Sequence, residues 1–462
     1  MTGVRSTEET PWSPLGYIVA KRTYARRLEE NKVDSATEEW HDICIRVVKA
    51  AQTQLKVGFT PEEENKLYTY MMQLKGTVAG RFLWQLGTPT VDKLGLLSLQ
   101  NCAYVTIDNP VTPFTWAFDA LMLGSGVGYG IQREHIYKLP KVRKDFHRAV
   151  RQDNASASFI VPDSREGWVA LLDRLLRSAF YKDTACGFTY STQLVRGKGA
   201  PIAGFGGTAS GPEELCAGID SIGRILEDRA GKQLRPIDCL DIMNIIGQVV
   251  VSGNVRRSAQ IAIGDFDDVQ YLKAKDWSSG TIPNWRAFSN NSVVCNDFNL
   301  LPQAFWDTYS GGREPYGLIN LKLSRSQGRL GETQYPDPDV QGFNPCAEQS
   351  LCNYETCCLA ELFLPNIVSK EEMLDVAKLL YRVNKHSLAL KCHQSSTQKI
   401  VHKNMRMGIG ITGILQAPEK MGWCDWVYRQ LRDYDKQYSK QRGWPASVKL
   451  TTVKPSIGGF VR

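Results

Sequence analysis

Long apolar runs are missing from this sequence. No stretch of its 462 residues approaches the roughly 18 unbroken apolar residues that a membrane-spanning helix needs. The first residues, MTGVRSTEETPWSP, lack the apolar core behind a basic start that marks an export signal. Internal repeats, low-complexity tracts and long linkers are absent as well. We therefore expect a cytoplasmic protein without a membrane partner.

Two common nucleotide-binding signatures are also missing. No glycine-rich segment matches the dinucleotide fingerprint between a strand and a helix, and the Walker spacing that ends in Gly-Lys-Ser or Gly-Lys-Thr is absent. Classical hydride-transfer enzymes and P-loop enzymes are therefore disfavoured. The glycine-rich segments that remain are GSGVGYG at 124–130, GKGAPIAGFGGTASGP at 197–212 and MGIGITG at 407–413. Segments of this kind are more often tight connections than phosphate sites.

Charge is moderate and evenly spread. The chain has 56 Lys and Arg against 48 Asp and Glu, a net charge of +8 without a basic tail or stripe. This balance fits phosphorylated small molecules as well as nucleic acid, and an ordinary solvated surface is its commonest meaning, so charge does not decide the function. We expect no DNA or RNA partner. With 42% hydrophobic residues and 10% aromatic residues the chain is globular, and its length predicts one large barrel or two to three domains.

Hydrophobic patterning changes near residue 95. Residues 1–95 are predicted to be helical, with a capping box of Thr60 and Glu63 ahead of an apolar helical face. Beyond them, short β-rich segments alternate with longer helical patterns such as VALLDRLLRSAF and EEMLDVAKLLYRV. The β-rich segments are CAYVTID, AQIAIGD, NSVVC and YGLINL. Such alternation predicts an α/β sheet or barrel with parallel strand pairs.

The segment that could carry chemistry is GFNPCAE at 342–348. Pro345 biases Asn344 towards an extended conformation, and if the chain stays extended, Cys346 and Glu348 project from the same side. A thiol and a carboxylate facing one substrate suit a reaction in which sulfur abstracts or attacks at one atom while the carboxylate takes a proton from a neighbouring hydroxyl. The Asn344 amide would then hold a hydroxyl group.

Two other interpretations of these cysteines stay open at this point. In the first, Cys346 is a small buried hydrophobe beside an exposed Glu348, which is the commoner situation for a cysteine at such a spacing. In the second, Cys346, Cys352 and Cys357 bind zinc, although their separations of six and five positions exceed the usual knuckle of about two to four residues.

The residues around Cys346 resemble the three-cysteine active site of ribonucleotide reductases. The matching segments are NPCAE at 344–348, ETC at 355–357 and NC at 101–102. The resemblance is strongest to the monomeric adenosylcobalamin-dependent ribonucleoside triphosphate reductases, and it covers nearly the whole chain. Further blocks in family order are Arg22-Thr23-Tyr24, AGRFLWQLGT, VPDSREGW, GFGGTASGP, GNVRRSAQIAIGD, FSNNSVV, MRMGIGITG and SVKLTTVKPS.

The resemblance implies a fold. It predicts a ten-stranded α/β barrel over residues 96–462 with a central finger loop at about 340–350, preceded by the helical region of residues 1–95. A helical region at about 163–250 would surround an effector site. Relatives continue with a long further segment where this chain reads IGGFVR and stops. We therefore expect a C-terminally incomplete barrel from a split or interrupted enzyme, with a complementary C-terminal polypeptide as a partner.

The resemblance also implies roles for single residues. Cys346 would become a thiyl radical and take hydrogen from C3′ of the ribose, Glu348 would accept the proton of the 3′-hydroxyl, and Asn344 would bond to the sugar hydroxyls. Cys102 and Cys357 would deliver the reducing hydrogens at C2′ and finish as a disulfide, which a thioredoxin-like protein would reduce. Adenosylcobalamin would generate the radical, with its contacts largely in the missing C-terminal part. No separate metal site is predicted.

Two nucleotide-phosphate regions follow from the same resemblance. Lys454, Pro455 and Ser456 would begin a loop that binds the substrate phosphates through backbone amides. A deoxynucleotide or ATP effector would bind near VPDSREGW and GFGGTASGP. The candidate residues there are Asp163, Ser164, Gly206, Gly207, Thr208, Ala209 and Ser210. The alternative for Asp163 and Ser164 is an N-cap of the helix that follows them.

The resemblance implies one activity, and two alternatives to that activity stay open. The chain would reduce ribonucleotides, and ribonucleoside triphosphates in particular, to deoxyribonucleotides for DNA synthesis. The alternative is an inactive fragment that keeps only nucleotide binding, and a third interpretation draws the radical from a separate metalloprotein subunit or a glycyl radical. Cys352 and Cys358 are extra thiols near the predicted site, either inert and buried or able to scramble the disulfide.

Overall fold

The computed structural model describes residues 12–29, 35–200, 208–252, 259–280, 282–310, 316–326 and 336–453. The chain divides into two compact units. Unit 1 combines Met1–Asn101 with Cys357–Arg462, and unit 2 is Cys102–Thr356. The N-terminal helical region thus shares a unit with the C-terminal part of the chain, and the predicted division at residue 95 stays a prediction.

Helices dominate unit 1. Its helices are α1 (Pro14–Thr23), α2 (Trp40–Thr53), α3 (Pro61–Met72), α4 (Gly80–Gln85), α5 (Pro89–Leu94), α14 (Lys370–Leu388), α15 (Ser395–Asn404) and α16 (Met421–Arg442), with short 3-10 turns at Leu96–Ser98, Leu364–Asn366, Ile414–Gln416 and Pro418–Lys420. The predicted capping box opens α3, because the Thr60 hydroxyl accepts from Glu63 N at 3.2 Å while Glu63 Oε2 accepts from Thr60 N at 2.9 Å.

A small sheet organises unit 1. It has the order β1 (Gly76–Val78), β13 (Leu359–Phe363) and β14 (Gly408–Thr412). Strand β13 pairs antiparallel with β1 and parallel with β14, while α14 packs against β1, β13 and α16. The glycine-rich segment MGIGITG therefore contains the strand β14, whose first three residues are buried, and is not a tight connection.

Helix α14 buries a histidine. His386 is 5% exposed. One ring nitrogen lies 3.0 Å from Leu55 O and the other 2.8 Å from Tyr438 Oη. Burial lowers the pKa of His386 to about 4. The folded protein therefore holds this ring neutral at pH values where the unfolded chain protonates it.

This histidine makes folding stability depend on pH. Below its ordinary pKa of 6.5 the unfolded state binds a proton that the folded state excludes down to about pH 4, so stability falls as the pH drops through that window. We expect protonation of this group to lower the free energy of unfolding by about 2 to 3 kcal/mol between pH 7 and pH 4. Urea unfolding at a series of pH values in this range measures that free energy. His386→Gln should flatten the dependence relative to His393→Gln at an exposed position, and equal slopes would contradict the assignment.

A parallel sheet forms the centre of unit 2. Its strands β2 (Cys102–Thr106), β3 (Gly126–Gly130), β7 (Gln260–Asp265), β8 (Asn290–Val294) and β9 (Gly317–Ile319) are parallel neighbours, and the full sheet order is β12 (Thr356–Cys357)-β2-β3-β7-β8-β9. The four β-rich segments predicted from the sequence are β2, β7, β8 and β9. β2 and β3 are buried along their whole length, as expected of parallel strands covered on both faces.

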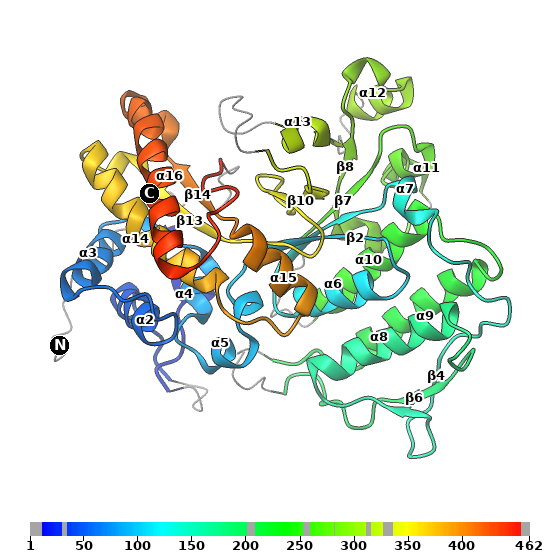
Figure 1. Ribbon diagram of the computed structural model, residues 1–462. Coiled ribbons are helices and arrows are strands. Elements are labelled where there is room, and N and C mark those ends of the chain that lie inside the picture. The colour runs from blue at the N-terminus through cyan, green and yellow to red at the C-terminus, as the bar shows by residue number, and fades with distance from the viewer. Residues whose placement is uncertain are drawn as a thin grey trace. The chain divides into compact units, whose positions relative to one another are not determined.

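Helices cover this sheet. α6 (Thr112–Met122), α8 (Arg165–Phe180), α9 (Glu213–Asp228) and α10 (Pro236–Val251) lie together on one side of it (Figure 1). α6 packs against β2 and β3, and α10 packs against β7 and is buried almost all round. Unit 2 also contains the short helices α7 (Arg133–Ile136), α11 (Val269–Leu272), α12 (Gln303–Ser310) and α13 (Leu321–Ser326) and the 3-10 turns Trp277–Ser279, Asn284–Phe288 and Phe298–Leu300. Its smaller sheets are a parallel one of β4 (Val150–Arg151), β6 (Thr189–Ser191) and β5 (Phe159–Ile160), and a pair of β10 (Gly342–Phe343) with β11 (Ser350–Leu351). Among the described residues of either unit, no helix combines the length and apolarity that crossing a bilayer requires.

Candidate active site

Cys346 lies at the turn of a hairpin. β10 (Gly342–Phe343) pairs antiparallel with β11 (Ser350–Leu351), and we call residues 342–351 the finger hairpin. Asn344 N donates to Gln349 O at 3.2 Å and Ala347 N donates to Asn344 O at 2.8 Å. These bonds close the six-residue loop between the strands. The hairpin occupies the place predicted for the finger loop.

The loop is turned, contrary to the extended conformation assumed for it. The bond from Ala347 N to Asn344 O closes a turn around Cys346, and Ala347 itself has a φ of 60°. The alternation of side chains along a strand therefore does not apply to Cys346 and Glu348. Cys346 is exposed, whereas Glu348 is partly buried. The interpretation of Cys346 as a buried hydrophobe is wrong.

Asn344 is fully buried. Its side-chain Oδ1 accepts from Gln349 N at 3.0 Å, so the amide braces the loop from inside. Sequence reasoning missed Gln349 as the partner, because a hydrogen bond across a loop leaves no periodic signal. The predicted contact of Asn344 with sugar hydroxyls stays a prediction.

Glycines bring the finger hairpin close to the sheet. A Cβ at Gly128 would lie 1.9 Å from Phe343 O, and a Cβ at Gly126 would lie 3.0 Å from Pro345 Cγ. Both glycines belong to β3, so GSGVGYG is a strand that admits the hairpin and not a tight connection. The absence of side chains on this face lets backbone meet backbone. This explains why the segment carries alternating glycines.

Cys102 begins its strand at the level of the hairpin tip. The register of the sheet places Cys102 opposite Gly126, and Gly126 approaches Pro345, the residue before Cys346. Cys102 is also buried. The structure therefore brings the neighbourhood of Cys102 and that of Cys346 together within unit 2.

Cys357 is the second residue of β12 and is fully buried. The chain just before it is fixed within unit 2, since Tyr104 N donates to Glu355 O at 3.0 Å and Cys352 N donates to Glu355 Oε2 at 2.8 Å. Cys102 and Cys357 fall on opposite sides of the unit boundary. Their pairing stays a prediction.

The extra thiols Cys352 and Cys358 are both buried. Cys358 Sγ lies 3.5 Å from Ser387 Oγ and 3.9 Å from Asn384 O. Burial raises the pKa of Cys358 to about 12, so almost no thiolate is present at neutral pH. This favours the inert interpretation of Cys358.

Thiol reactivity should separate Cys346 from Cys358. Because alkylation needs an accessible thiolate, a brief treatment of the native protein with iodoacetamide near pH 8 should modify Cys346 and leave Cys358 unmodified. Peptide mass spectrometry measures both. Denaturation before labelling is the control and should expose Cys358. Labelling of Cys358 at a rate like that of Cys346 in the native state would contradict its assignment.

The predicted effector residues line one cavity. Its volume is about 140 Å³, and it brings Asp163 and Ser164 together with Thr208, Ala209 and Ser210. The other lining residues are Met122, Arg165, Trp168, Val195, Arg196, Gly211, Val249 and Val250. Gly206 and Gly207 lie outside the described residues. The structure thus joins two segments that are far apart in the sequence.

The contacts around this cavity are specific. Ser164 caps α8, since its hydroxyl accepts from Gly167 N at 3.0 Å, which confirms the N-cap interpretation. Asp163 Oδ2 pairs with Arg196 Nε at 2.8 Å. Sequence reasoning missed Arg196, although it is a cation placed just before a glycine-rich segment. Asp163 neutralises the Arg196 guanidinium, so the N-terminus of α8 is the source of positive potential for an anion here.

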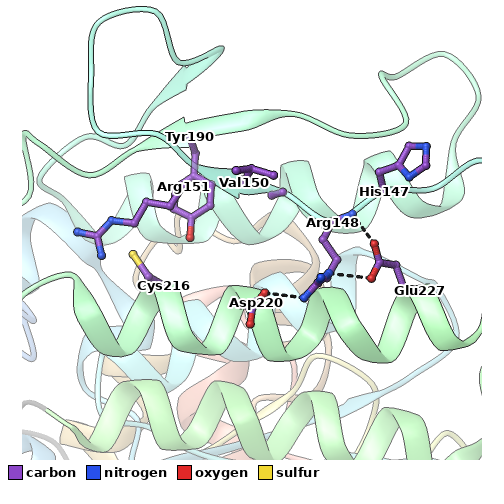
Figure 2. Close-up of a pocket in the computed structure, with 9 residues that line it drawn as sticks. His147, Arg148, Val150, Arg151, Tyr190, Cys216, Asp220 and Glu227 are labelled. Carbon is purple, nitrogen blue, oxygen red and sulfur yellow. Dashed lines mark hydrogen bonds and ion pairs between the residues drawn. The ribbon is translucent and has the colours of Figure 1, made fainter.

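A second hollow lies on the same unit, with a volume of about 470 Å³ (Figure 2). Its charged groups neutralise one another. Arg148 is paired with Asp220 at 3.0 Å and Glu227 at 2.7 Å, and Arg151 with Glu213 at 2.7 Å. This hollow was not predicted from the sequence.

Lys454, Pro455 and Ser456 lie outside the described residues. The chain that leads to them runs beside β14, because Met407 N donates to Lys449 O at 3.0 Å and Ile409 N donates to Leu450 O at 2.9 Å. Among the described residues, no group of three or more His, Cys, Asp or Glu side chains could hold a metal ion. The three cysteines of the zinc interpretation do not form such a group.

Comparisons with known proteins identify the family of the chain. The family described as "B12-dependent ribonucleotide reductase, insertion domain" matches residues 134–226, and "Ribonucleotide reductase alpha domain" matches residues 1–88. An adenosylcobalamin-dependent ribonucleoside-triphosphate reductase from Lactobacillus gasseri is 31% identical over 97% of this chain and 72% of its own length. A protein named as a probable enzyme of this kind from Dictyostelium discoideum is 34% identical over 96% of this chain and 62% of its own length.

Solved structures agree as well. A crystal structure of a B12-dependent (class II) ribonucleotide reductase matches with a TM-score of 0.83 and 29% identity, over 98% of this chain and 74% of that one. The alpha subunit of the class Id enzyme from Actinobacillus ureae, at 12% identity and a TM-score of 0.53 over 99% of this chain and 75% of that one, shows the fold alone. The predicted ribonucleotide-reductase type of α/β fold is confirmed. The chain belongs to the family of adenosylcobalamin-dependent ribonucleoside-triphosphate reductases.

Proposed function

We propose that this chain reduces ribonucleoside triphosphates to 2′-deoxyribonucleotides in the cytoplasm, for DNA synthesis, with Cys346 as the radical-bearing residue. The observation that carries the proposal is the exposed thiol of Cys346 at the tip of the finger hairpin. The glycines of β3 have no side chains and so leave room for that hairpin to lie against the sheet. The residues that surround Cys346 match the family motif in order and spacing.

The radical step needs a sulfur that a substrate and a cofactor can both reach. Adenosylcobalamin, when bound, supplies the unpaired electron, since ordinary side chains cannot abstract hydrogen from carbon at neutral pH. The described residues fit this requirement at Cys346, whose thiol is exposed and carried on a hairpin braced by Asn344 and Gln349. As a thiyl, Cys346 takes the hydrogen atom from C3′ and returns one at the end of the reaction.

Glu348 is the proposed base. It lies two residues after Cys346 in the same loop and is partly buried. A carboxylate there accepts the proton of the 3′-hydroxyl as the C3′ radical forms, which helps the 2′-hydroxyl to leave as water. The turn at Ala347 sets the direction of Glu348 relative to the thiol. Glu348 is therefore expected to matter for the rate more than for substrate affinity.

Cys102 and Cys357 are the proposed reductants. Two thiols give two hydrogens and two electrons, the 2′-hydroxyl leaves as water, C2′ gains hydrogen, and the two sulfurs form a disulfide. A thioredoxin-like dithiol then reduces that disulfide. The position of Cys102 opposite Gly126, next to the hairpin tip, supports its part in this step.

Nucleotide regulation is assigned to the cavity at α8. The N-terminus of α8, capped by Ser164, favours an anion, and Thr208, Ala209 and Ser210 line the same cavity. A deoxynucleotide triphosphate or ATP is the proposed effector. Lys454, Pro455 and Ser456 are the proposed ligands of the substrate phosphates.

The experiment that tests the function is direct. The chain is assayed for deoxynucleotide formation with ribonucleoside triphosphate and a dithiol, with and without adenosylcobalamin, alone and with a complementary C-terminal polypeptide. We expect product only with adenosylcobalamin. Nucleotide binding without product under every condition would instead support the inactive binding fragment, and product without adenosylcobalamin would support a different radical source.

A further inference from the structure

The entry to the finger hairpin is bonded to β2. Tyr104 is fully buried, and its hydroxyl donates at 3.0 Å to Gln341 O, on the residue just before the hairpin. The Thr106 hydroxyl donates to the side chain of the same residue, Gln341 Oε1, at 2.5 Å. Gln341 N in turn donates to Leu351 O at 2.9 Å and closes the base of the hairpin. We call Tyr104 and Thr106, with their bonds to Gln341, the β2 clamp.

The chain that leaves the hairpin is bonded to the same strand. Tyr104 N donates to Glu355 O at 3.0 Å, and Thr106 N donates to Asn353 Oδ1 at 2.8 Å. Asn353 Nδ2 also donates to Asp108 Oδ2 at 3.0 Å, just beyond the end of β2. The two residues of the β2 clamp therefore hold the chain on both sides of the finger hairpin.

Two glycines leave space for the Tyr104 side chain. A Cβ at Gly342, the first residue of the hairpin, would lie 2.1 Å from Tyr104 Cε2, and a Cβ at Gly130 would lie 2.3 Å from Tyr104 Oη. Any side chain at either position would push the ring or its hydroxyl away. The hairpin entry and β3 are thus both shaped around this one phenol.

Tyr104 and Cys102 lie on one face of β2, because side chains alternate along a strand and the two residues are two positions apart. The hairpin entry contacts this face at Tyr104. The hairpin tip is level with Cys102, since Cys102 is opposite Gly126 and a Cβ at Gly126 would lie 3.0 Å from Pro345 Cγ. Two residues of a strand span roughly 6 to 7 Å. The place at which Tyr104 holds the entry therefore sets the level of the tip relative to Cys102.

Core packing alone does not explain this tyrosine. Phenylalanine would fill the same volume without a buried hydroxyl, and a buried hydroxyl stabilises a protein only where it has a partner. The partner of Tyr104 is a backbone carbonyl at the hairpin entry. Burial also raises the pKa of Tyr104 well above its ordinary value, so the hydroxyl stays protonated and remains a donor at neutral pH.

We propose that the β2 clamp is a positioning device for the radical step: it fixes the finger hairpin along β2 and so holds the Cys346 thiol at the level of Cys102. This inference rests on the proposed function of Cys346 and deepens it. Tyr104 and Thr106 are positioning residues, since both act through Gln341. Loosening the clamp should slow turnover and leave substrate binding nearly unchanged, because a displacement of about 1 Å at a reacting group costs about a hundredfold in rate.

The test removes one hydroxyl from each residue of the clamp. Tyr104→Phe keeps the ring and deletes the bond to Gln341 O, which is the main change. Thr106→Val keeps the shape of the side chain and deletes the bond to Gln341 Oε1. Each variant takes away one donor from an oxygen of Gln341 and leaves every cysteine in the sequence.

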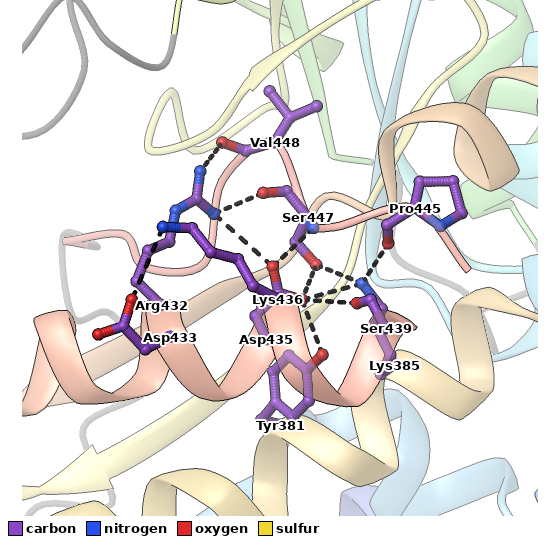
Figure 3. Close-up of polar contacts among 10 residues, drawn as sticks. All are labelled: Tyr381, Lys385, Arg432, Asp433, Asp435, Lys436, Ser439, Pro445, Ser447 and Val448. Carbon is purple, nitrogen blue, oxygen red and sulfur yellow. Dashed lines mark hydrogen bonds and ion pairs between the residues drawn. The ribbon is translucent and has the colours of Figure 1, made fainter. Parts of the chain in front are cut away.

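Tyr381→Phe is the matched control. Tyr381 is also fully buried, but it lies on α14 in unit 1, and its hydroxyl donates to Asp435 Oδ1 at 2.7 Å. Figure 3 shows this hydroxyl in a polar cluster with Lys385, whose Nζ lies 3.0 Å from Asp435 Oδ1. The control removes the same atom from an equally buried ring. It should therefore destabilise the protein, but it deletes none of the bonds of the finger hairpin.

Tyr271→Phe is a second control, within unit 2. Tyr271 is fully buried, and its hydroxyl lies 2.9 Å from both Ala262 O on β7 and Ser292 O on β8. This substitution weakens the same sheet at strands that do not carry the β2 clamp.

Two measurements are made on each protein. Hydrogen exchange reports the amides of Gln341, Ala347 and Gln349, which close the hairpin, and steady-state kinetics of the complete enzyme with adenosylcobalamin report kcat and KM. For Tyr104→Phe we expect at least tenfold faster exchange at these amides and an at least tenfold lower kcat, with KM changed less than twofold. Thr106→Val should show the same pattern more weakly. Both controls should lower the thermal unfolding temperature and change kcat and hairpin exchange less than twofold.

The outcomes separate this inference from the function on which it rests. Faster exchange with an unchanged kcat would overturn the positioning role alone. Unchanged exchange in both clamp variants would show that other contacts hold the hairpin, which also overturns it, as would an equal fall of kcat in the controls. If the unaltered enzyme forms no product with adenosylcobalamin, the proposed function fails and the inference fails with it. If Tyr104→Phe does not fold, the Thr106→Val result decides.

Discussion

Cys346→Ser should abolish deoxynucleotide formation. A serine hydroxyl cannot carry the radical, because its O–H bond is far stronger than the S–H bond of a thiol, so we expect turnover to fall by about a thousandfold or more, with no base or acid able to compensate. Product formation in the complete enzyme with adenosylcobalamin is the measurement. Substrate binding should stay within a few fold of the unaltered protein, since Cys346 makes no predicted ground-state contact that serine would lose.

The matched control for this change is Cys352→Ser. Cys352 lies six positions further along and is 3% exposed, so its sulfur has no predicted access to substrate. Turnover in this variant should stay within a few fold, apart from any effect of burying a hydroxyl. Retained turnover in Cys346→Ser, or an equal loss in both variants, would contradict the assignment of the radical to Cys346.

Gly128→Ala should nearly inactivate the enzyme although it replaces none of the cysteines. The added Cβ would meet Phe343 O at 1.9 Å, and a backbone oxygen cannot move aside as a side chain can. The finger hairpin must shift, and a displacement of about 1 Å at a reacting group costs about a hundredfold in rate. Overpacking should also lower the free energy of unfolding by about 1 to 3 kcal/mol.

Gly422→Ala is the control for this substitution. A Cβ at Gly422 meets nothing within 4 Å, and the residue lies in the first turn of α16. Gly422→Ala should therefore keep the steady-state turnover and the thermal unfolding temperature of the unaltered protein, whereas Gly128→Ala should lower both. If Gly128→Ala keeps full activity, the close contact between β3 and the finger hairpin does not position Cys346.

Local signals in the sequence predicted local structure well. The capping box at Thr60 and Glu63 and the strands β2, β7, β8 and β9 all appear where the patterning placed them. Caps and buried strands depend on residues close in the chain, and their signals are correspondingly local. The resemblance around Cys346 likewise predicted a loop at about 340–350, where the structure has the finger hairpin.

Other features could not be predicted from the sequence, because they depend on contacts between segments that are distant in the chain. The glycines of β3 were interpreted as a tight connection, since nothing local shows that Phe343 will pack on Gly128. The prediction that Cys346 and Glu348 project from the same side assumed an extended chain, and the turn at Ala347 shows that the chain is not extended there. Lys385 and Asp435 gave no signal, being fifty positions apart, and buried ion pairs form only once the fold brings their helices together.

We propose that Cys102 and Cys357 together supply two hydrogens, one that bonds to C2′ and one that leaves with the 2′-hydroxyl as water. The most direct test of this proposal is to run a single turnover of the reduced enzyme without added dithiol, quench in acid, and map thiols and disulfides by differential alkylation and mass spectrometry. We expect one equivalent of a disulfide that joins Cys102 to Cys357, with Cys346, Cys352 and Cys358 still reduced. A disulfide between any other pair, or product with both cysteines still alkylated as thiols, would contradict it.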